Sequence, residues 1–217
     1  MLKYITFNTG AEILCFLIAV ICLSGNIKPV WKFFIPYLFI TCATEFTGIY
    51  LKRLHHPNQW PYNILLIVQI LFNSLVFMHL FNKFIKSKAI ITGGLIALFI
   101  IYAYDIISHG FFIINELTYS SMCVLFVIYC FYYFYLLLNN DEYIVLKYSA
   151  NFWWVSGSLL FYFGSTAVNL FREQLTPIVV ADHNLTYFIN IILDIILYGF
   201  WSYSFICKKW LTPTLKA

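Results

Sequence analysis

Four carboxylic acids stand inside long apolar stretches of this sequence: Glu12, Glu45, Asp105 and Asp194. Each stretch is long enough to cross a bilayer, and none of them carries a Lys or Arg at depth. An ionisable side chain at the bilayer centre costs about 3 kcal/mol on insertion scales, so such side chains face a protein interior or a hydrated cavity. Acids without a basic partner are protonated, hydrogen-bonded or paired with a cation that the chain itself does not supply. The pattern therefore predicts a site for a proton, a metal or alkali cation, or an amine.

Other polar residues accompany these acids at helical spacing. Residues three and four apart share one face of a helix, and around Asp194 polar and aromatic residues recur at those intervals. From this pattern we expect the following residues to bind a ligand or proton: Asp194, Glu45, Asp105, Glu12, Asn190, Asn73, Gln69, Asn169, Tyr162, Tyr198 and Trp201. The alternative is that the stripes only join helices, since Ser, Thr, Asn and Gly often line helix contacts in membranes, with about 1 kcal/mol per hydrogen bond. That alternative fits Ser158 and Ser165 better than it fits the carboxylates.

Metal chemistry has weaker support in the sequence. His109 and His183 are the candidate ligands, with Asp105 or Asp182 beside them, but their spacing is not a known motif. A zinc hydrolase needs about three converging ligands. The six cysteines lie within or at the end of apolar segments without a C-x-x-C pair, which is typical of buried thiols that pack as small hydrophobic residues. We identify no catalytic residue set and expect no cofactor.

The elements that must position these residues are membrane helices. The chain has 217 residues, of which 62% are hydrophobic and only 10% charged, whereas soluble domains have about 25% charged residues. A helix that crosses the bilayer core takes about 20 apolar residues. We therefore predict one all-α domain, residues 1–217, with spans near 7–25, 31–52, 61–82, 88–108, 117–138, 149–171 and 185–207.

The basic residues indicate which end faces the cytoplasm. With the N-terminus outside, the external segments hold four: Lys3, Lys52, Arg53 and Arg172. The internal segments hold nine: Lys28, Lys32, Lys83, Lys86, Lys88, Lys147, Lys208, Lys209 and Lys216. The positive-inside rule then favours an external N-terminus and a cytoplasmic C-terminus. An alternative for the first span is a signal peptide, but Glu12 interrupts its approach and no small-x-small cleavage pattern precedes Asn26.

This orientation places most of the candidate site residues in the outer half of the membrane. Glu12, Glu45 and Asp105 fall in the outer part of their spans, and Asp194 falls near the middle. We therefore expect a cavity that opens to the outside and is lined by acids, amides and tyrosines. The net charge of +4 does not indicate nucleic acid, because the basic residues lie at the ends of the spans.

Several segments resemble a poorly characterised family of small bacterial seven-helix membrane proteins. The similar features are Glu45 in the second span, Tyr62-Asn63-Ile64 at the start of the third, and 81–86 at its end. Two more are the aromatic-rich segment 152–164 and the segment 190–198. Members of that family are often encoded beside sensor histidine kinases, so the resemblance implies a sensory or signalling role. It implies no catalytic residue.

From these observations we expect a multi-pass protein of a bacterial inner membrane that acts as a sensor or receptor. A small polar or cationic ligand, or a proton, would bind near Asp194, Glu45 and Asp105 and change the cytoplasmic face. The short internal loops favour a separate signalling partner, such as a histidine kinase, or contact with anionic lipid. The alternatives are a small proton- or cation-coupled transporter or channel, an intramembrane metal-dependent hydrolase, and a structural subunit.

Overall fold

A computed structural model describes residues 7–25, 29–140, 145–180 and 183–211, with residues 180, 183 and 211 described by their backbone alone. The long helices are α1 (Phe7–Leu23), α3 (Phe34–Arg53), α4 (Trp60–Phe81), α5 (Lys88–His109), α6 (Glu116–Leu138), α7 (Ala150–Leu170) and α9 (Leu185–Ile206). The shorter elements are α2 (Pro29–Lys32), η2 (Leu146–Tyr148), α8 (Arg172–Leu175), β1 (Val179–Val180), β2 (His183–Asn184) and the terminal π-helix η3 (Cys207–Leu211). The ranges predicted from hydropathy coincide with the long helices to within three residues at either end.

Local sequence explains where several helices begin and end. Pro61 lies in the first turn of α4, where a missing backbone N–H removes no helical hydrogen bond. The side chain of Ser149 accepts a hydrogen bond from the Phe152 amide and so caps the start of α7. Helix α5 ends at Gly110, whose φ of 85° lies in the left-handed region that a side chain disfavours. Strands β1 and β2 form a two-residue antiparallel pair between α8 and α9.

Five helices in the described part of the chain are long and apolar enough to span a membrane: Pro29–Arg53 (α2 with α3), α4, α5, α6 and Leu185–Trp210 (α9 continuing into η3). Helix α1 is apolar but has only 17 residues. Helix α7 has 21 residues, and its Asn, Ser and Thr side chains make it less apolar. The protein is therefore a helical membrane protein with several spans, as the composition predicted.

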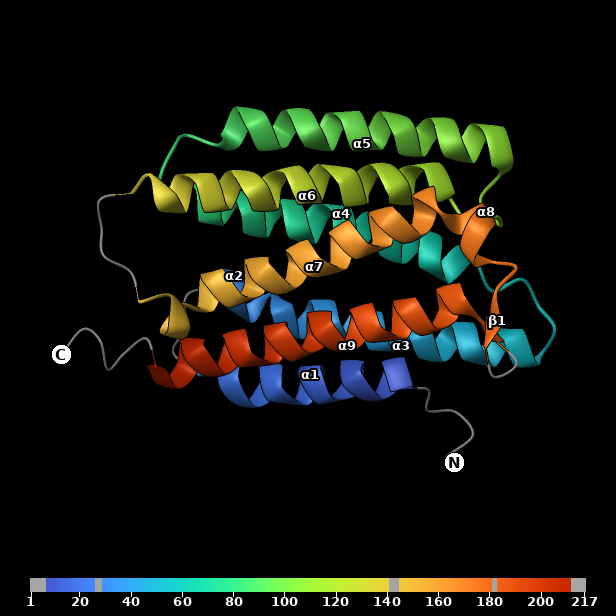
Figure 1. The fold of residues 1–217 in the computed structure, drawn as a ribbon, viewed down its shortest axis with the longest axis horizontal. Helices are drawn as coiled ribbons and strands as arrows, with labels where there is room; N and C mark the ends of the chain where they lie inside the picture. The colour runs from blue at the N-terminus through green and yellow to red at the C-terminus, as the bar shows by residue number, and fades with distance from the viewer. Residues whose placement is uncertain (1–6, 26–28, 141–144, 181–182, 212–217) are drawn as a thin grey trace.

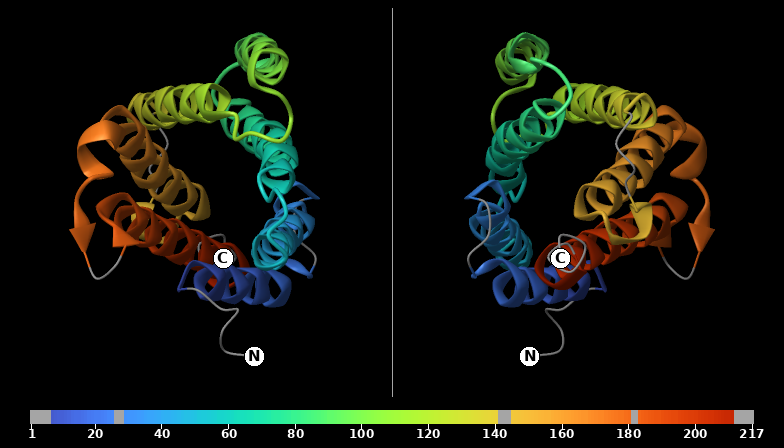
Figure 2. Two further views of the ribbon diagram at one scale, coloured as in Figure 1. Left: turned by 90° about the vertical axis from the view of Figure 1, so that its right-hand side faces the viewer. Right: turned by 90° about the vertical axis from the view of Figure 1, so that its left-hand side faces the viewer.

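Six of the long helices form a closed ring (Figure 2). Around the ring, α1 packs against α3, α3 against α4, α4 against α6, α6 against α7, α7 against α9, and α9 against α1. Helix α5 lies outside the ring and packs on α4 and α6. The first and last long helices of the chain are thus neighbours, and successive long helices alternate in direction along one common axis (Figure 1).

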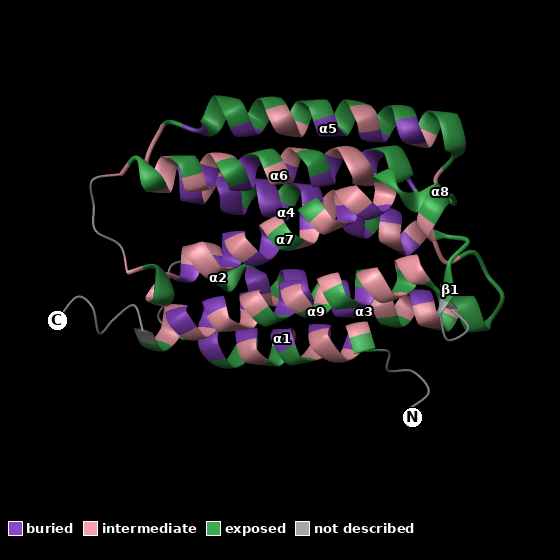
Figure 3. Cartoon of the chain, in the orientation of Figure 1, coloured by how far each residue is buried: buried purple, intermediate pink, exposed green. Residues whose placement is uncertain are grey.

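The outward faces of the helices expose large apolar side chains, as lipid contact requires. Phe39, Ile100, Phe131 and Leu138 are among many that are more than half exposed. Soluble monomers rarely expose contiguous apolar surfaces of this extent. Figure 3 shows the exposed residues along the whole length of α5 and on the outer sides of the other helices. This surface supports the membrane assignment independently of hydropathy.

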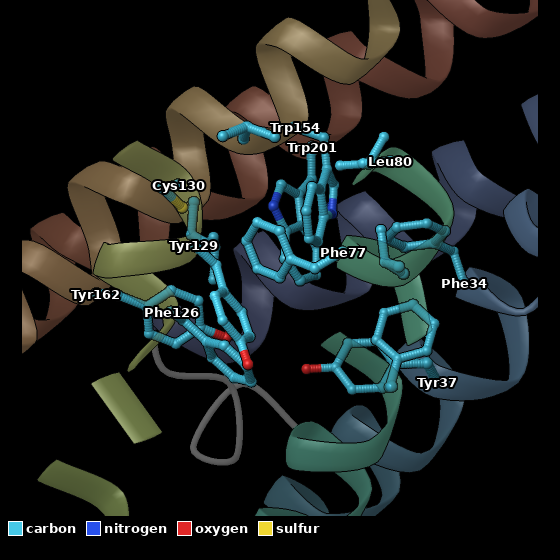
Figure 4. Packing of buried hydrophobic residues seen from close by; sticks show 14 of the residues in the cluster. Phe34, Tyr37, Phe77, Leu80, Phe126, Tyr129, Cys130, Trp154, Tyr162 and Trp201 are labelled. Atoms are coloured by element: carbon cyan, nitrogen blue, oxygen red, sulfur yellow. The ribbon is translucent and has the colours of Figure 1, made fainter. Parts of the chain in front are cut away.

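An aromatic cluster fills the ring on the side of the C-terminal ends of α4 and α9. It consists of Phe34, Phe72, Phe77, Trp154, Trp201 and Phe205. The rings of Trp154 and Trp201 stack with centroids 5.8 Å apart, and Phe34 contacts both edge-on. Figure 4 shows four of these side chains pointing into the centre of the bundle: Phe34 from α3, Phe77 from α4, Trp154 from α7 and Trp201 from α9. The cluster closes the ring at this level.

Candidate acidic cavity

A cavity of about 230 Å³ lies inside the ring on the other side of the aromatic cluster. Seven of the predicted site residues line it: Glu12, Glu45, Gln69, Tyr162, Asp194, Tyr198 and Trp201. Trp201 belongs to both the cavity and the aromatic cluster and so forms part of the floor. The described lining contains no Lys, Arg or His. The three carboxylates interact with one another electrostatically, and they repel one another when they are ionised.

Two hydrogen bonds between α1 and α9 hold two of these carboxylates. Asn8 Nδ2 donates to Asp194 Oδ2 at 2.7 Å, and the Tyr198 hydroxyl donates to Glu12 Oε1 at 3.1 Å. Asn8 and Glu12 lie four residues apart on α1, as do Asp194 and Tyr198 on α9. The two helices run in the same direction (Figure 1), so equal spacing puts donor and acceptor opposite each other twice. This arrangement aligns α1 with α9.

Glu12 is the most deeply buried of the three acids. Its side chain is 5% exposed, and Oε2 is buried without a hydrogen-bond partner in the described part of the protein. Glu45 receives a hydrogen bond of 3.3 Å from the Tyr62 hydroxyl. A buried carboxylate oxygen without a donor loses its hydration without compensation. A ligand that donates a hydrogen bond to Glu12 Oε2 would therefore be stabilised there.

The connection between α5 and α6 forms one wall of the cavity, through Ile114 and Asn115. Asn63 of α4 anchors this connection: Nδ2 donates to the carbonyl oxygens of Phe111 and Ile113, each at 2.7 Å. Asn63 Oδ1 accepts from the backbone N–H of Asn115 at 3.3 Å. One amide side chain thus fixes three backbone groups of the connection. The Asn115 side chain is fully buried, and neither Nδ2 nor Oδ1 has a partner among the described residues.

Asp105 does not line the cavity, contrary to the expectation from its depth. Its Oδ2 accepts from both the backbone N–H and the hydroxyl of Thr118, at 3.0 and 2.9 Å, in the first turn of α6. Its Oδ1 lies 3.0 Å from His109 Nδ1. Asp105 therefore satisfies an unpaired amide at a helix N-terminus and joins α5 to α6. Asp105 thus fixes the two helices on either side of the α5–α6 connection, which forms the cavity wall.

The remaining predicted amides also lie outside the cavity. Asn73 Nδ2 donates to the carbonyl oxygen of Gln69, one turn earlier on α4. Asn169 Nδ2 donates to Ser120 Oγ at 3.2 Å. Asn169 and Asn190 line a second cavity of about 230 Å³, together with the ion pair of Arg172 and Glu116. Helical periodicity put these amides on inward faces, but the neighbouring helices divide the interior into separate spaces.

The metal candidates are not brought together. In the described part of the chain, no group of three or more His, Cys, Asp or Glu side chains is placed to hold a metal ion. His109 is half exposed and pairs with Asp105. The side chain of His183 and the whole of Asp182 lie outside the described residues. The six cysteines are buried and unbridged, as expected.

The small and hydroxyl residues of α7 join helices. Ser158 Oγ accepts from Trp201 Nε1 at 3.2 Å and donates to the Trp154 carbonyl oxygen at 2.9 Å. At Gly157 and Gly164 the side chains of Phe200 and Leu193 occupy the space that a Cβ would need. These glycines let α9 approach α7 closely.

Several lining residues were not among the predicted site residues. They are Tyr37, Tyr62, Asn63, Asn115 and Tyr119. Asn115 lies outside every predicted span, so no periodicity pointed to it. Asn8 holds Asp194, and its spacing of four from Glu12 was the available signal. The sequence contains 17 tyrosines, and nothing in their spacing distinguished Tyr37, Tyr62 and Tyr119 from the others.

The fold and the cavity define a class: a multi-pass helical membrane protein with a buried acidic cavity walled by tyrosines and amides. Comparisons of the chain with protein-family models, curated proteins and solved structures gave no match.

Proposed function

We propose that this protein is a membrane sensor that binds a small cation in the acidic cavity and passes the binding event to its cytoplasmic end. The observation that carries the proposal is the convergence of Glu12, Glu45 and Asp194 on one cavity whose described lining has no basic side chain. A cation relieves the mutual repulsion of the carboxylates, whereas an anion meets no positive charge there.

The proposal includes seven membrane spans. Helices α1 and α7 lie alongside the five apolar helices and are needed to close the ring (Figure 2). With 17 residues, α1 is about 26 Å long, near the lower limit for a span. The polar groups of α7 include Ser158, Thr166 and Asn169, whose side chains bond within the protein. The length of α1 and these internal bonds of α7 support the insertion of both helices in the bilayer.

The proposed orientation has the N-terminus outside and the C-terminus in the cytoplasm of a bacterial cell. At the end of the bundle that holds η3, the described basic residues are Lys32, Lys83, Lys86, Lys88, Lys147, Lys208 and Lys209. At the other end they are Lys52, Arg53 and Arg172. This asymmetry supports the positive-inside orientation. Lys3, Lys28 and Lys216, which also entered the prediction, lie outside the described residues.

The aromatic cluster favours a sensor over an open channel. It lies between the cavity and the proposed cytoplasmic end, which supports a packed floor beneath the cavity. Trp201 lines the cavity and contacts the ring of Phe34, which stacks on Trp31. Lys208 Nζ lies 5.2 Å from the Trp31 ring centroid. Movement of Trp201 on binding would therefore reach the basic end, where a histidine kinase or another partner would read it.

Ligand-dependent thermal unfolding of the purified protein tests this function. A cation that binds the native state raises the melting temperature by the amount that RT ln(1 + [L]/Kd) requires. The increase should disappear in Asp194→Asn and Glu45→Gln and persist in Glu173→Gln, an exposed acid on α8. A wild-type protein that shows no response to any cation would refute the proposal.

A cation-coupled transporter is the second candidate, because mutually repelling carboxylates suit exchange of a proton for a cation. It requires the aromatic cluster to open during a transport cycle. Uptake of cations into proteoliposomes that Asp194→Asn abolishes would favour the transporter. Binding without uptake would favour the sensor.

A further inference from the structure

Several polar groups around Glu12 and Glu45 are left as hydrogen-bond acceptors. The Tyr198 and Tyr62 hydroxyls donate their protons to Glu12 and Glu45, so their oxygen lone pairs remain available. Glu12 Oε2 also lacks a donor. A ligand that satisfies these groups must bring several N–H or O–H donors. A primary ammonium group has three donors and no acceptor, and it carries the positive charge that the carboxylates require.

Asn115 adds an independent requirement. Its side chain is 0% exposed, lines the cavity, and has no partner for either Nδ2 or Oδ1 among the described residues. Leaving a buried amide without partners costs about 1–3 kcal/mol per group. A group with both a donor and an acceptor, such as a hydroxyl or an amide, satisfies both atoms at once. Because Asn115 stands on the α5–α6 connection and Glu12 on α1, the ligand needs two polar groups at different places.

The size and shape of the lining restrict the ligand further. A volume of about 230 Å³ equals roughly seven or eight water molecules and is below the usual range for drug-sized ligands. Glu12, Glu45 and Asp194 are each held by a different neighbour on different helices. In the described part of the chain no three His, Cys, Asp or Glu side chains are placed to hold a metal ion, which needs its oxygen ligands together at about 2.0–2.6 Å.

We propose that the ligand is a small organic amine with one primary ammonium group and a hydroxyl or amide group a few bonds away. The ammonium group binds at Glu12, with Asp194 and Glu45 balancing its charge, and the second group binds Asn115. This inference rests on the proposed function and narrows its ligand class. Quaternary amines lack the donors, and amino acids carry a carboxylate that the cavity repels.

The experiment measures Kd from the dependence of melting temperature on ligand concentration, at pH 7 and matched ionic strength. The probes are 2-aminoethanol, ethylamine, ethylene glycol, tetramethylammonium, K⁺ and Mg²⁺. We expect 2-aminoethanol to bind best and ethylamine to bind about fivefold more weakly, because it lacks one hydrogen-bonding group. Ethylene glycol and tetramethylammonium should bind at least tenfold more weakly than 2-aminoethanol, since one lacks the charge and the other the donors.

Two variants assign the binding groups. Glu12→Gln should weaken both primary amines by roughly 30-fold or more, as loss of a buried charge partner does. Asn115→Leu should remove the difference between 2-aminoethanol and ethylamine. Should that variant not fold, Asn115→Ala removes the amide with a smaller side chain, and it should remove the same difference. Glu173→Gln and Asn139→Leu, at exposed positions, are the matched controls and should leave both Kd values unchanged.

The outcomes separate this inference from the proposed function. Stabilisation by K⁺ or Mg²⁺ but by no amine would overturn the amine assignment and leave the cation sensor standing. Equal affinity for 2-aminoethanol and ethylamine in the wild type would overturn the role of Asn115. The absence of any response to all the cations and amines would overturn both proposals.

Discussion

Tyr198 donates its hydroxyl proton to Glu12 across 186 positions of sequence, and this bond joins the last long helix of the chain to the first. The Asn8–Asp194 bond one turn away has the same sequence separation. Each bond pairs a carboxyl group with a neutral donor, so neither bond places a positive charge beside the acid. The geometry that aligns the two helices is thus also the geometry that presents the carboxylates.

Tyr198→Phe should lower the free energy of unfolding by about 1–3 kcal/mol, because both oxygens of a buried carboxyl group then lack a donor. Thermal unfolding in detergent measures the change. Tyr104→Phe, at a side chain that is 60% exposed, is the control and should behave as wild type. A Tyr198→Phe protein as stable as wild type would show that the hydroxyl does not stabilise Glu12.

Asp105→Ala should loosen the start of α6, because the Thr118 amide and hydroxyl lose their acceptor. We expect a loss of about 1–3 kcal/mol, the cost of leaving buried hydrogen-bond donors without an acceptor. Faster proteolysis within the α5–α6 connection would report the local effect. His109→Gln should change stability by less than about 1 kcal/mol, since the half-exposed imidazole forms a partly solvated pair. Equal effects of the two variants would contradict this distinction.

Gly157→Ala should push α9 away from α7, because the new Cβ would lie 2.5 Å from Phe200 Cβ, an atom held by the backbone. Overpacking of this kind costs about 1–3 kcal/mol. Gly164→Ala should cost less, since there the new Cβ meets the flexible end of Leu193. Gly93→Ala is the control, because nothing lies within 4 Å of its Cβ position. Thermal unfolding of the three variants should give this order of stability, with Gly157→Ala the least stable.

Labelling of single introduced cysteines should reveal the proposed orientation. Phe112→Cys on the α5–α6 connection should react with a membrane-impermeant maleimide added to intact cells, because Phe112 is 63% exposed. Lys86→Cys, between α4 and α5, should react only after the cells are opened. The six native thiols are buried, so they should contribute little background. The reverse pattern would invert the orientation and place the cavity toward the cytoplasm.

Hydropathy was enough to locate the helices, because apolar runs of about 20 residues have few alternatives in a bilayer. Periodicity identified the inward faces that carry Glu45 and Asp194, and the cost of an unpaired acid within an apolar span pointed to Glu12; all three line one cavity. This reasoning failed for Asp105, because depth in a span does not say which neighbour a side chain meets. Asp105 lies on α5, the helix outside the ring, where an inward face looks toward α4 and α6 rather than the central axis.

Connections were the other weakness of the sequence-based prediction. Asn115 lines the cavity, and Asn63, 52 positions earlier in the sequence, holds its backbone in place. No local pattern encodes that distance. The glycines of α7 indicated a close helix contact, but the sequence did not show that Phe200 of α9 packs at Gly157.

The closure of the ring by α9 has a consequence for biogenesis. During synthesis Glu12 is in the membrane long before Tyr198 has left the ribosome, and Asn8 waits as long for Asp194. Until α9 inserts, α1 presents an acid to lipid or to a chaperone rather than to its final partner. A chain truncated before residue 185 would keep an open ring and an exposed carboxyl group in α1. Such a chain offers membrane proteases a polar signal inside the bilayer by which an unfinished copy is distinguished from a finished one.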